Sequence, residues 1–329
     1  MPDNVYLEPD NFIRHILERK VDLADLAESS RSSLNNTFLS VRPLLAALAA
    51  VAIWGASPAA TAVAGHNIPP ELIAGLRTVG GGIILLPLLF QFRGRFPTDW
   101  SARFELITGG VFGFAAYPLM LSIGVLKTSV THASVILAAA PIFTGLLSFL
   151  ITGHWPKVRW WLGGAIAMSG ISLLMVSRGL PSGAGSTASL TGDALVLLSV
   201  IFSSFGYVFG GRSSARIGQW PATVWAITIG ALALAPMTIP AAIAFEWSSV
   251  DTTGFAALLF LILFVTIIGY ALWFYALGQA GATAVAPLQF LQPVLGVVLA
   301  VALLGEALSL LLVLSGALII LGVRLTRKA

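Results

Sequence analysis

The sequence predicts an all-α integral membrane protein with ten transmembrane helices, arranged as two inverted five-helix repeats. Three observations lead to this fold class: the composition, the number of long apolar runs and a gapless match between the two halves of the chain. Hydrophobic residues fill 57% of the 329 positions and charged residues only 10%, whereas a soluble domain is about a quarter charged. Lipid is therefore the expected solvent for most of the chain.

Ten apolar runs are each long enough to cross a bilayer, since a spanning helix needs about 20 mostly apolar residues. The runs lack the strict alternation of barrel strands, so we expect helices. The expected spans cover residues 44–64, 72–92, 105–126, 131–151, 159–177, 192–211, 221–245, 254–277, 282–304 and 308–325.

Lys and Arg are distributed unevenly over the loops between these spans. With the N-terminus inside, the inner loops and tails hold fifteen of these residues, and the outer loops hold only Lys127 and Arg178. Cytoplasmic loops carry such an excess. The pattern predicts a multi-pass protein of the plasma (inner) membrane with both termini cytoplasmic. The scattered basic residues form no basic face, so we expect no nucleic-acid partner.

The two halves of the chain match each other without a gap at a fixed offset of 152 residues. Residues 131–170 align with 283–322, which pairs Pro141 with Pro293 and Gly153 with Gly305. The earlier spans match only loosely. Because five is an odd number of spans, the second copy is inverted in the membrane. Inverted repeats are typical of secondary transporters, whose substrate site lies at the repeat interface near the bilayer midplane.

Several motifs support a family resemblance. These are "WGAS" (54–57), an arginine early in the second span, "APIFTGLLSFLITG" (140–153) and "QPVLGVVLAVALLGEALSLLLVLSGALIILGV" (292–323). With them, residues 43–326 resemble the EamA-like family of the drug/metabolite transporter superfamily. The resemblance implies two inverted five-helix repeats and transport of small organic solutes, often export of amino acids or other metabolites. The family commonly has Gly-Glu in both copies, whereas the first copy here has Gly153-His154.

The expected domains are a cytoplasmic polar tail over 1–42, a first EamA-like repeat over 43–178 and a second over 190–326. The expected function is alternating-access transport of small metabolites, amino acids or related solutes, with export favoured. Two alternatives remain: a nucleotide-sugar or multidrug carrier of the same superfamily, and a non-transporting membrane receptor or scaffold. Enzyme motifs, cofactor motifs and metal-ligand clusters are absent from the sequence, and it leaves the oligomeric state open.

Arg77 alone, among 18 Lys and Arg residues, lies inside a predicted span. A charge at the bilayer centre costs about 2.5–3.5 kcal/mol on the insertion scale. On one interpretation Arg77 faces the cavity and attracts a carboxylate, or gates the cavity together with Glu306. On the other it is a structural residue near a helix end, with a stem long enough to snorkel to the outer surface.

Other polar and aromatic residues inside the spans are candidates to contact the solute. The full set of substrate-binding candidates is Arg77, Trp54, Ser57, Tyr117, Tyr207, Tyr270, Trp273, Gln289 and Gln292. Gln289 and Gln292 are one turn apart, on one helix face, and either contact a polar solute or bond to other helices. For most of the aromatic residues the alternative is ordinary packing.

Prolines inside spans indicate helix irregularities, because proline has no N–H and frees a carbonyl one turn earlier. Pro141 and Pro293, with Arg77 and Glu306, are the gating candidates. No Asp or Glu is expected deep in any span. Proton coupling through a buried carboxylate is therefore not expected, and facilitated diffusion or exchange is favoured.

Overall fold

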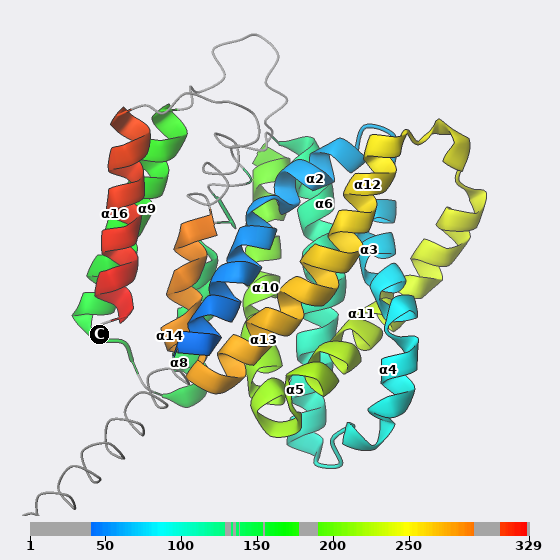
Figure 1. The fold of residues 1–329 in the computed structure, drawn as a ribbon, viewed down its shortest axis with the longest axis horizontal. Helices are drawn as coiled ribbons and strands as arrows, with labels where there is room; N and C mark the ends of the chain where they lie inside the picture. The colour runs from blue at the N-terminus through cyan, green and yellow to red at the C-terminus, as the bar shows by residue number, and fades with distance from the viewer. Residues whose placement is uncertain are drawn as a thin grey trace, which may run out of the picture. The chain divides into compact units, whose positions relative to one another are not determined.

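A computed structural model of the chain describes residues 41–128, 133, 136–137, 139–153, 155–177, 190–292 and 310–327. Within these ranges every regular element is a helix. Residues Leu44–Ala329 form one compact unit, and the description below concerns that unit (Figure 1). Nearly all of the predicted tail over 1–42 lies outside the described residues.

Five of the described helices are long and apolar enough to cross a membrane. They cover Val41–Ala64, Trp100–Lys127, Leu190–Ile217, Gln219–Ala244 and Thr252–Ala280. These correspond to the first, third, sixth, seventh and eighth predicted spans. The all-helical class is confirmed for the described residues, five of whose helices are candidate membrane spans, and the total of ten spans stays a prediction.

The remaining predicted spans contain shorter or partly described helices. The second holds α3 (Pro70–Ile84) and α4 (Leu86–Gln91), the fourth α8 (Ala140–Thr152), the fifth α9 (Val158–Ser177), the ninth α14 (Ala282–Val285) and η5 (Ala286–Leu291), and the tenth α16 (Leu310–Arg327). The sixth and seventh spans are α10 (Leu190–Ile217) and α11 (Gln219–Ala244), and the first ends in α2 (Ser57–Ala64).

The third and eighth spans are each interrupted by a π-helical segment. In the third, η2 (Phe112–Ala116) separates α5 (Trp100–Val111) from α6 (Tyr117–Lys127). In the eighth, η4 (Leu261–Ile268) separates α12 (Thr252–Phe260) from α13 (Gly269–Ala280). The 152-residue offset carries 112–116 onto 264–268, inside η4. The internal match thus reaches two spans in which the sequences themselves show no clear similarity.

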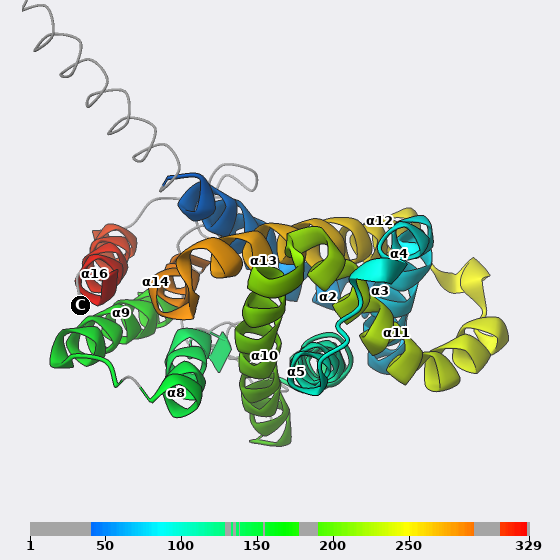
Figure 2. The same cartoon turned by 90° about the horizontal axis from the view of Figure 1, so that it is seen from below.

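Helices of the two halves pack against each other in corresponding pairs. The second span packs on the seventh (α3 on α11), the fourth on the ninth (α8 on η5) and the fifth on the tenth (α9 on α16). The first packs on the eighth (α2 on α12), and the sixth packs on the third (α10 on α5 and α6). Figures 1 and 2 show α9 and α16 side by side. A two-fold relation between the halves would produce this reciprocal pattern.

Glycines permit the closest of these crossings. A Cβ atom added to Gly163 of α9 would lie 2.7 Å from the carbonyl oxygen of Gly322 and 2.7 Å from the nitrogen of Thr326, both in α16. Backbone atoms cannot move aside as a flexible side chain does. The same holds where Gly113 of η2 meets Gly206 of α10, with a Cβ 2.8 Å from the opposing Cα. Small residues allow such approaches between membrane helices.

Gly163 and its neighbour Gly164 offer a matched test of this packing. We expect Gly163→Ala to destabilise the protein by about 1–3 kcal/mol, because the methyl group forces the two backbones apart. Gly164→Ala meets nothing within 4 Å, so it should be neutral or slightly stabilising through its better helix propensity. Thermal unfolding of the purified variants in detergent measures the difference. Equal melting temperatures for the two variants would contradict the α9–α16 crossing.

Candidate functional site

The described loops gather at two opposite ends of the helices. One hollow is lined by Phe92, Arg95, Arg216 and Trp220, which brings the second and sixth loops together. At the other end, the Thr128 hydroxyl donates to the Asp193 carboxylate at 2.6 Å, which joins the third and fifth loops. This up-and-down arrangement agrees with the predicted topology, and the end that carries Arg95 and Arg216 is the predicted cytoplasmic end.

Four aromatic side chains meet between the halves. Trp54 of the first half lies with ring centroids 5.5 Å from Tyr207, 5.0 Å from Tyr270 and 5.2 Å from Trp273. All four are at most 5% exposed, and we call them the aromatic cluster. Tyr270 and Trp273 both reach Trp54 because residues three apart share a helix face.

Two backbone carbonyls in the π segments hold members of this cluster. The indole Nε1 of Trp54 donates to the carbonyl of Val265 in η4 at 3.0 Å. The hydroxyl of Tyr270 donates to the carbonyl of Gly113 in η2 at 3.5 Å. The 152-residue offset pairs Gly113 with Val265, so equivalent carbonyls accept from an aromatic residue of the opposite half.

Local sequence explains why the Gly113 carbonyl is available. The N–H of Tyr117 bonds to the carbonyl of Phe112, five residues earlier, as in a π-helix. The next residue, Pro118, has no N–H to give to Gly113. A carbonyl left without a helical partner inside lipid requires another donor, and Tyr270 supplies it.

A second proline-freed carbonyl lies at Trp54. Its helical donor would be residue 58, which is a proline. The amide Nε2 of Gln292 donates to this carbonyl instead, at 3.0 Å. Gln292 therefore makes the interhelical bond that the sequence left as one of two alternatives. The side chain of Gln289, three residues earlier, lies beside that of Tyr207, so both amides reach the aromatic cluster.

Arg77 is buried beside this cluster rather than at the surface. Its side chain is 1% exposed, so the snorkelling alternative is wrong. Its Nε donates to the Thr266 hydroxyl at 3.2 Å, and its Cζ lies 6.0 Å from the Tyr117 ring centroid. Thr266 in turn donates to the carbonyl of Leu261 at 2.8 Å. In the described part of the chain, no carboxylate forms an ion pair with Arg77.

Several buried polar atoms around Arg77 and the cluster have no hydrogen-bond partner among the described residues. They are Nη1 of Arg77, Nε1 of Trp273, Oγ of Ser57 and Oε1 of Gln289. An unsatisfied buried polar group costs about 1–3 kcal/mol. A site that holds several of them is suited to a polar ligand.

The structure thus brings together eight of the nine substrate-binding candidates, and Ser57 is buried nearby at the start of α2. Thr266, which sequence reasoning did not single out, completes the set through its bond to Arg77. Of the gating candidates, Pro141 is buried in the first turn of α8. Pro293 and Glu306 lie outside the described residues.

Comparison with known proteins identifies the family. The model of the EamA-like transporter family matches residues 41–176 and again residues 190–327, one match in each half. The chain belongs to the EamA-like transporter family. It is accordingly a membrane transporter by family, and nothing in the comparison indicates an enzyme.

Relatives of this EamA-like chain bear transporter names. The uncharacterized transporter YdeK of Bacillus subtilis is 30% identical over 283 residues, covering 84% of this chain and 94% of the relative. A protein of Salmonella typhimurium named "Probable amino-acid metabolite efflux pump" is 29% identical, covering 80% and 87%. A crystal structure with 18% identity and a TM-score of 0.68 covers 87% of this chain and 97% of that one, which shows a shared fold.

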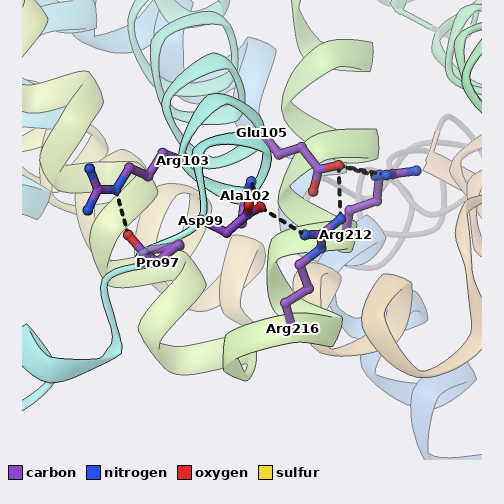
Figure 3. A network of polar contacts seen from close by, with 7 residues as sticks. All are labelled: Pro97, Asp99, Ala102, Arg103, Glu105, Arg212 and Arg216. Atoms are coloured by element: carbon purple, nitrogen blue, oxygen red, sulfur yellow. Dashed lines mark hydrogen bonds and ion pairs between the residues drawn. The ribbon is translucent and has the colours of Figure 1, made fainter.

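The EamA-like chain also contains a buried acid, contrary to the expectation from sequence. Glu105 is 4% exposed, and its Oε1 lies 2.6 Å from Nη2 of Arg212 and 3.4 Å from Nη2 of Arg216. Figure 3 shows Glu105 of α5 between these two arginines of α10. Asp99, at 3.9 Å from Arg216, adds a weaker contact.

The expectation failed because the helix ends were misplaced. The third span was expected to begin at 105, but α5 begins at Trp100, so Glu105 lies in its second turn. The sixth span was expected to end at 211, but α10 continues to Ile217 and carries Arg212 and Arg216 on one face. That spacing of two arginines was the signal for a carboxylate partner.

The Arg77–Thr266 bond can be tested through stability. We expect Thr266→Val to lower the unfolding free energy by about 1–3 kcal/mol, because it leaves the buried Nε of Arg77 without its acceptor. Thr266→Ser keeps the hydroxyl and serves as the control. Melting temperatures in detergent give the comparison, and a Val variant as stable as the Ser variant would refute the role of this hydroxyl.

Proposed function

We propose that this protein is a secondary transporter of small organic solutes that carry one carboxylate, amino acids or closely related metabolites, by alternating access. Export from the cell is the favoured direction. The proposal depends mainly on Arg77. Its guanidinium is buried beside the aromatic cluster, and within the described ranges its Nη1 has no hydrogen-bond partner and no acid lies opposite it. A solute carboxylate would supply the missing charge, with shorter and stronger hydrogen bonds than neutral groups make.

The proposed architecture is that of ten spans in two inverted repeats, over 43–178 and 190–326, in the plasma (inner) membrane with both termini cytoplasmic. Support comes from the reciprocal helix pairs and from the equivalent π segments. The site would then lie between the halves, where each contributes residues to it. This is the location expected for inverted-repeat transporters.

The aromatic cluster would receive the apolar part of the solute. Its rings offer flat apolar faces, and Trp273 Nε1 and Gln289 Oε1 offer one donor and one acceptor. An α-amino group could bond to the Gln289 oxygen while the carboxylate faces Arg77. The name of the Salmonella relative, an amino-acid metabolite efflux pump, agrees with this substrate class.

Facilitated diffusion or exchange remains the favoured mode of coupling. A buried acid such as Glu105 is the usual candidate for a proton carrier, but two arginines already share its Oε1. Glu105 therefore serves as an ion-pair partner that joins α5 to α10.

A multidrug carrier is the second candidate, because stacked aromatic rings also attract organic cations. The buried positive charge of Arg77 opposes this function. A nucleotide-sugar substrate would bring a diphosphate, for which a single buried arginine at the site is a weak match.

A thermal-shift screen of the purified protein separates these candidates. The ligands are the amino acids singly, their amides, nucleotide sugars and lipophilic cations. A ligand that binds only the folded state raises the unfolding free energy, by about 2.7 kcal/mol at a concentration of 100 times its Kd. The melting temperature rises accordingly. We expect amino acids to stabilise the protein and their amides to have little effect.

Arg77→Gln should abolish the shift by amino acids, whereas Arg93→Gln, an exposed arginine of η1, should retain it. Each shift is measured against the ligand-free melting temperature of the same variant, since removing a buried charge changes stability by itself. A shift produced only by lipophilic cations and unchanged in Arg77→Gln would overturn the proposal in favour of multidrug transport.

A further inference from the structure

A second hollow lies between the aromatic cluster and the arginine-rich end. It measures about 340 Å³, within the range of about 300–1,000 Å³ typical of small-molecule sites. α8 contributes Ser148 and Thr152, α10 contributes Tyr207 and Arg212, and α13 contributes Leu277 and Gly278. Most of its remaining lining is apolar. We call it the end pocket.

Tyr207 separates the end pocket from the central site. Tyr207 is one of the residues that line the pocket, and its ring stacks on Trp54 at 5.5 Å with an interplanar angle of 25°. The side chain of Gln289 lies beside it. One aromatic residue therefore belongs to both sites, and a solute passing between them would have to pass Tyr207.

Arg212 is the one charged residue among those that line the end pocket. Its Nε and Nη2 contact the same oxygen of Glu105, at 2.8 and 2.6 Å, so one edge of its planar guanidinium is fixed. Its side chain is still 38% exposed. The contacts with Glu105 leave the Nη1–Nη2 edge, and this edge can also bind a carboxylate through two parallel bonds.

The charges around Glu105 are compatible with an additional anion. Arg212 and Arg216 share the single buried carboxylate of Glu105, and the other acid nearby, Asp99, is 66% exposed and 3.9 Å from Arg216. Water screens that exposed pair. Of the two positive charges on Arg212 and Arg216, Glu105 neutralises one, and the other is only partly neutralised by Asp99.

We propose that the end pocket is an entry subsite for the solute on the predicted cytoplasmic side, in which Arg212 binds the solute carboxylate before Tyr207 admits the solute to Arg77. Glu105 is a positioning residue that fixes the guanidinium of Arg212. The apolar walls from α8 and α13 take the solute's side chain. This inference rests on the proposed function, since it requires a solute with a carboxylate.

Because the chain has no cysteine, occupancy of the end pocket can be measured with a single introduced thiol. Thr152→Cys places the thiol in the pocket lining, and Gly94→Cys places one in η1, outside the pocket and in open space. Both are alkylated with a membrane-impermeant maleimide in inside-out vesicles, in which the predicted cytoplasmic side faces the reagent. The probe ligand is L-phenylalanine, chosen for its aromatic side chain, and L-phenylalaninamide is the control without a carboxylate.

We expect L-phenylalanine to slow alkylation at Thr152→Cys but not at Gly94→Cys, and the amide to slow neither. Adding Arg212→Gln should raise the concentration of L-phenylalanine that halves the alkylation rate at Thr152→Cys about tenfold or more, as the loss of a charged hydrogen bond predicts. Adding Glu105→Gln instead should raise this concentration less. Adding Arg77→Gln should leave protection intact, because the end pocket is occupied before the central site.

The remaining outcomes are assigned as follows. Equal protection with and without Arg212→Gln would overturn the entry subsite. Loss of protection in Arg77→Gln would also overturn it, because protection would then come from a distant change caused by binding at the central site. A melting-temperature shift without protection would leave the proposed function standing and refute the entry subsite alone. Neither shift nor protection by L-phenylalanine would refute both for this solute. Lower stability of Glu105→Gln with unchanged protection would make Glu105 a structural tie only.

Discussion

The requirement that every backbone carbonyl in lipid find a donor governs how the two halves join. The third and eighth spans break the α-helical pattern at equivalent places, and each break offers a carbonyl to the opposite half. Tyr270 takes the one at Gly113, and Trp54 takes the one at Val265. The residues that satisfy the backbone are the same residues that form the aromatic cluster. The proposed binding surface is therefore also the structure that joins the two halves.

The contacts of Arg77 also join the two halves at the proposed site. A hydroxyl and an aromatic face compensate its charge only in part, and the hydroxyl, Thr266, belongs to the π segment of the other half. A fully paired arginine would be more stable but would have nothing left for a ligand. Buried polar groups left without partners at a functional site are a common cost of binding.

Apolar periodicity and proline chemistry sufficed to predict much of this site. Prolines inside spans were expected to free a carbonyl one turn earlier, and the Trp54 carbonyl, one turn before Pro58, accepts from Gln292. Gln289 and Gln292 were expected to share a helix face from their spacing, and both lie at the aromatic cluster. The π segments could not be predicted, because they depend on packing between spans that are more than a hundred residues apart. The burial of Glu105 was not predicted because helix ends are the least certain feature of an apolar run. The start of α5 and the end of α10 were both misplaced, so Arg212 and Arg216 were not recognised as its partners.

The two π segments also bear on how the halves could move. A π turn holds one residue more than the α turn it replaces, and it can travel along a helix by exchanging one hydrogen bond at a time. Each such step turns the residue that the π turn passes by about 100°, the angle per residue of an α-helix, and leaves the helix beyond it in place, without exposing a row of N–H groups to lipid. In this protein the helix beyond η4 begins with Gly269 and Tyr270. A π turn that moved past Tyr270 would therefore reorient this one member of the aromatic cluster while the rest of α13 and the neighbouring helices stay in place.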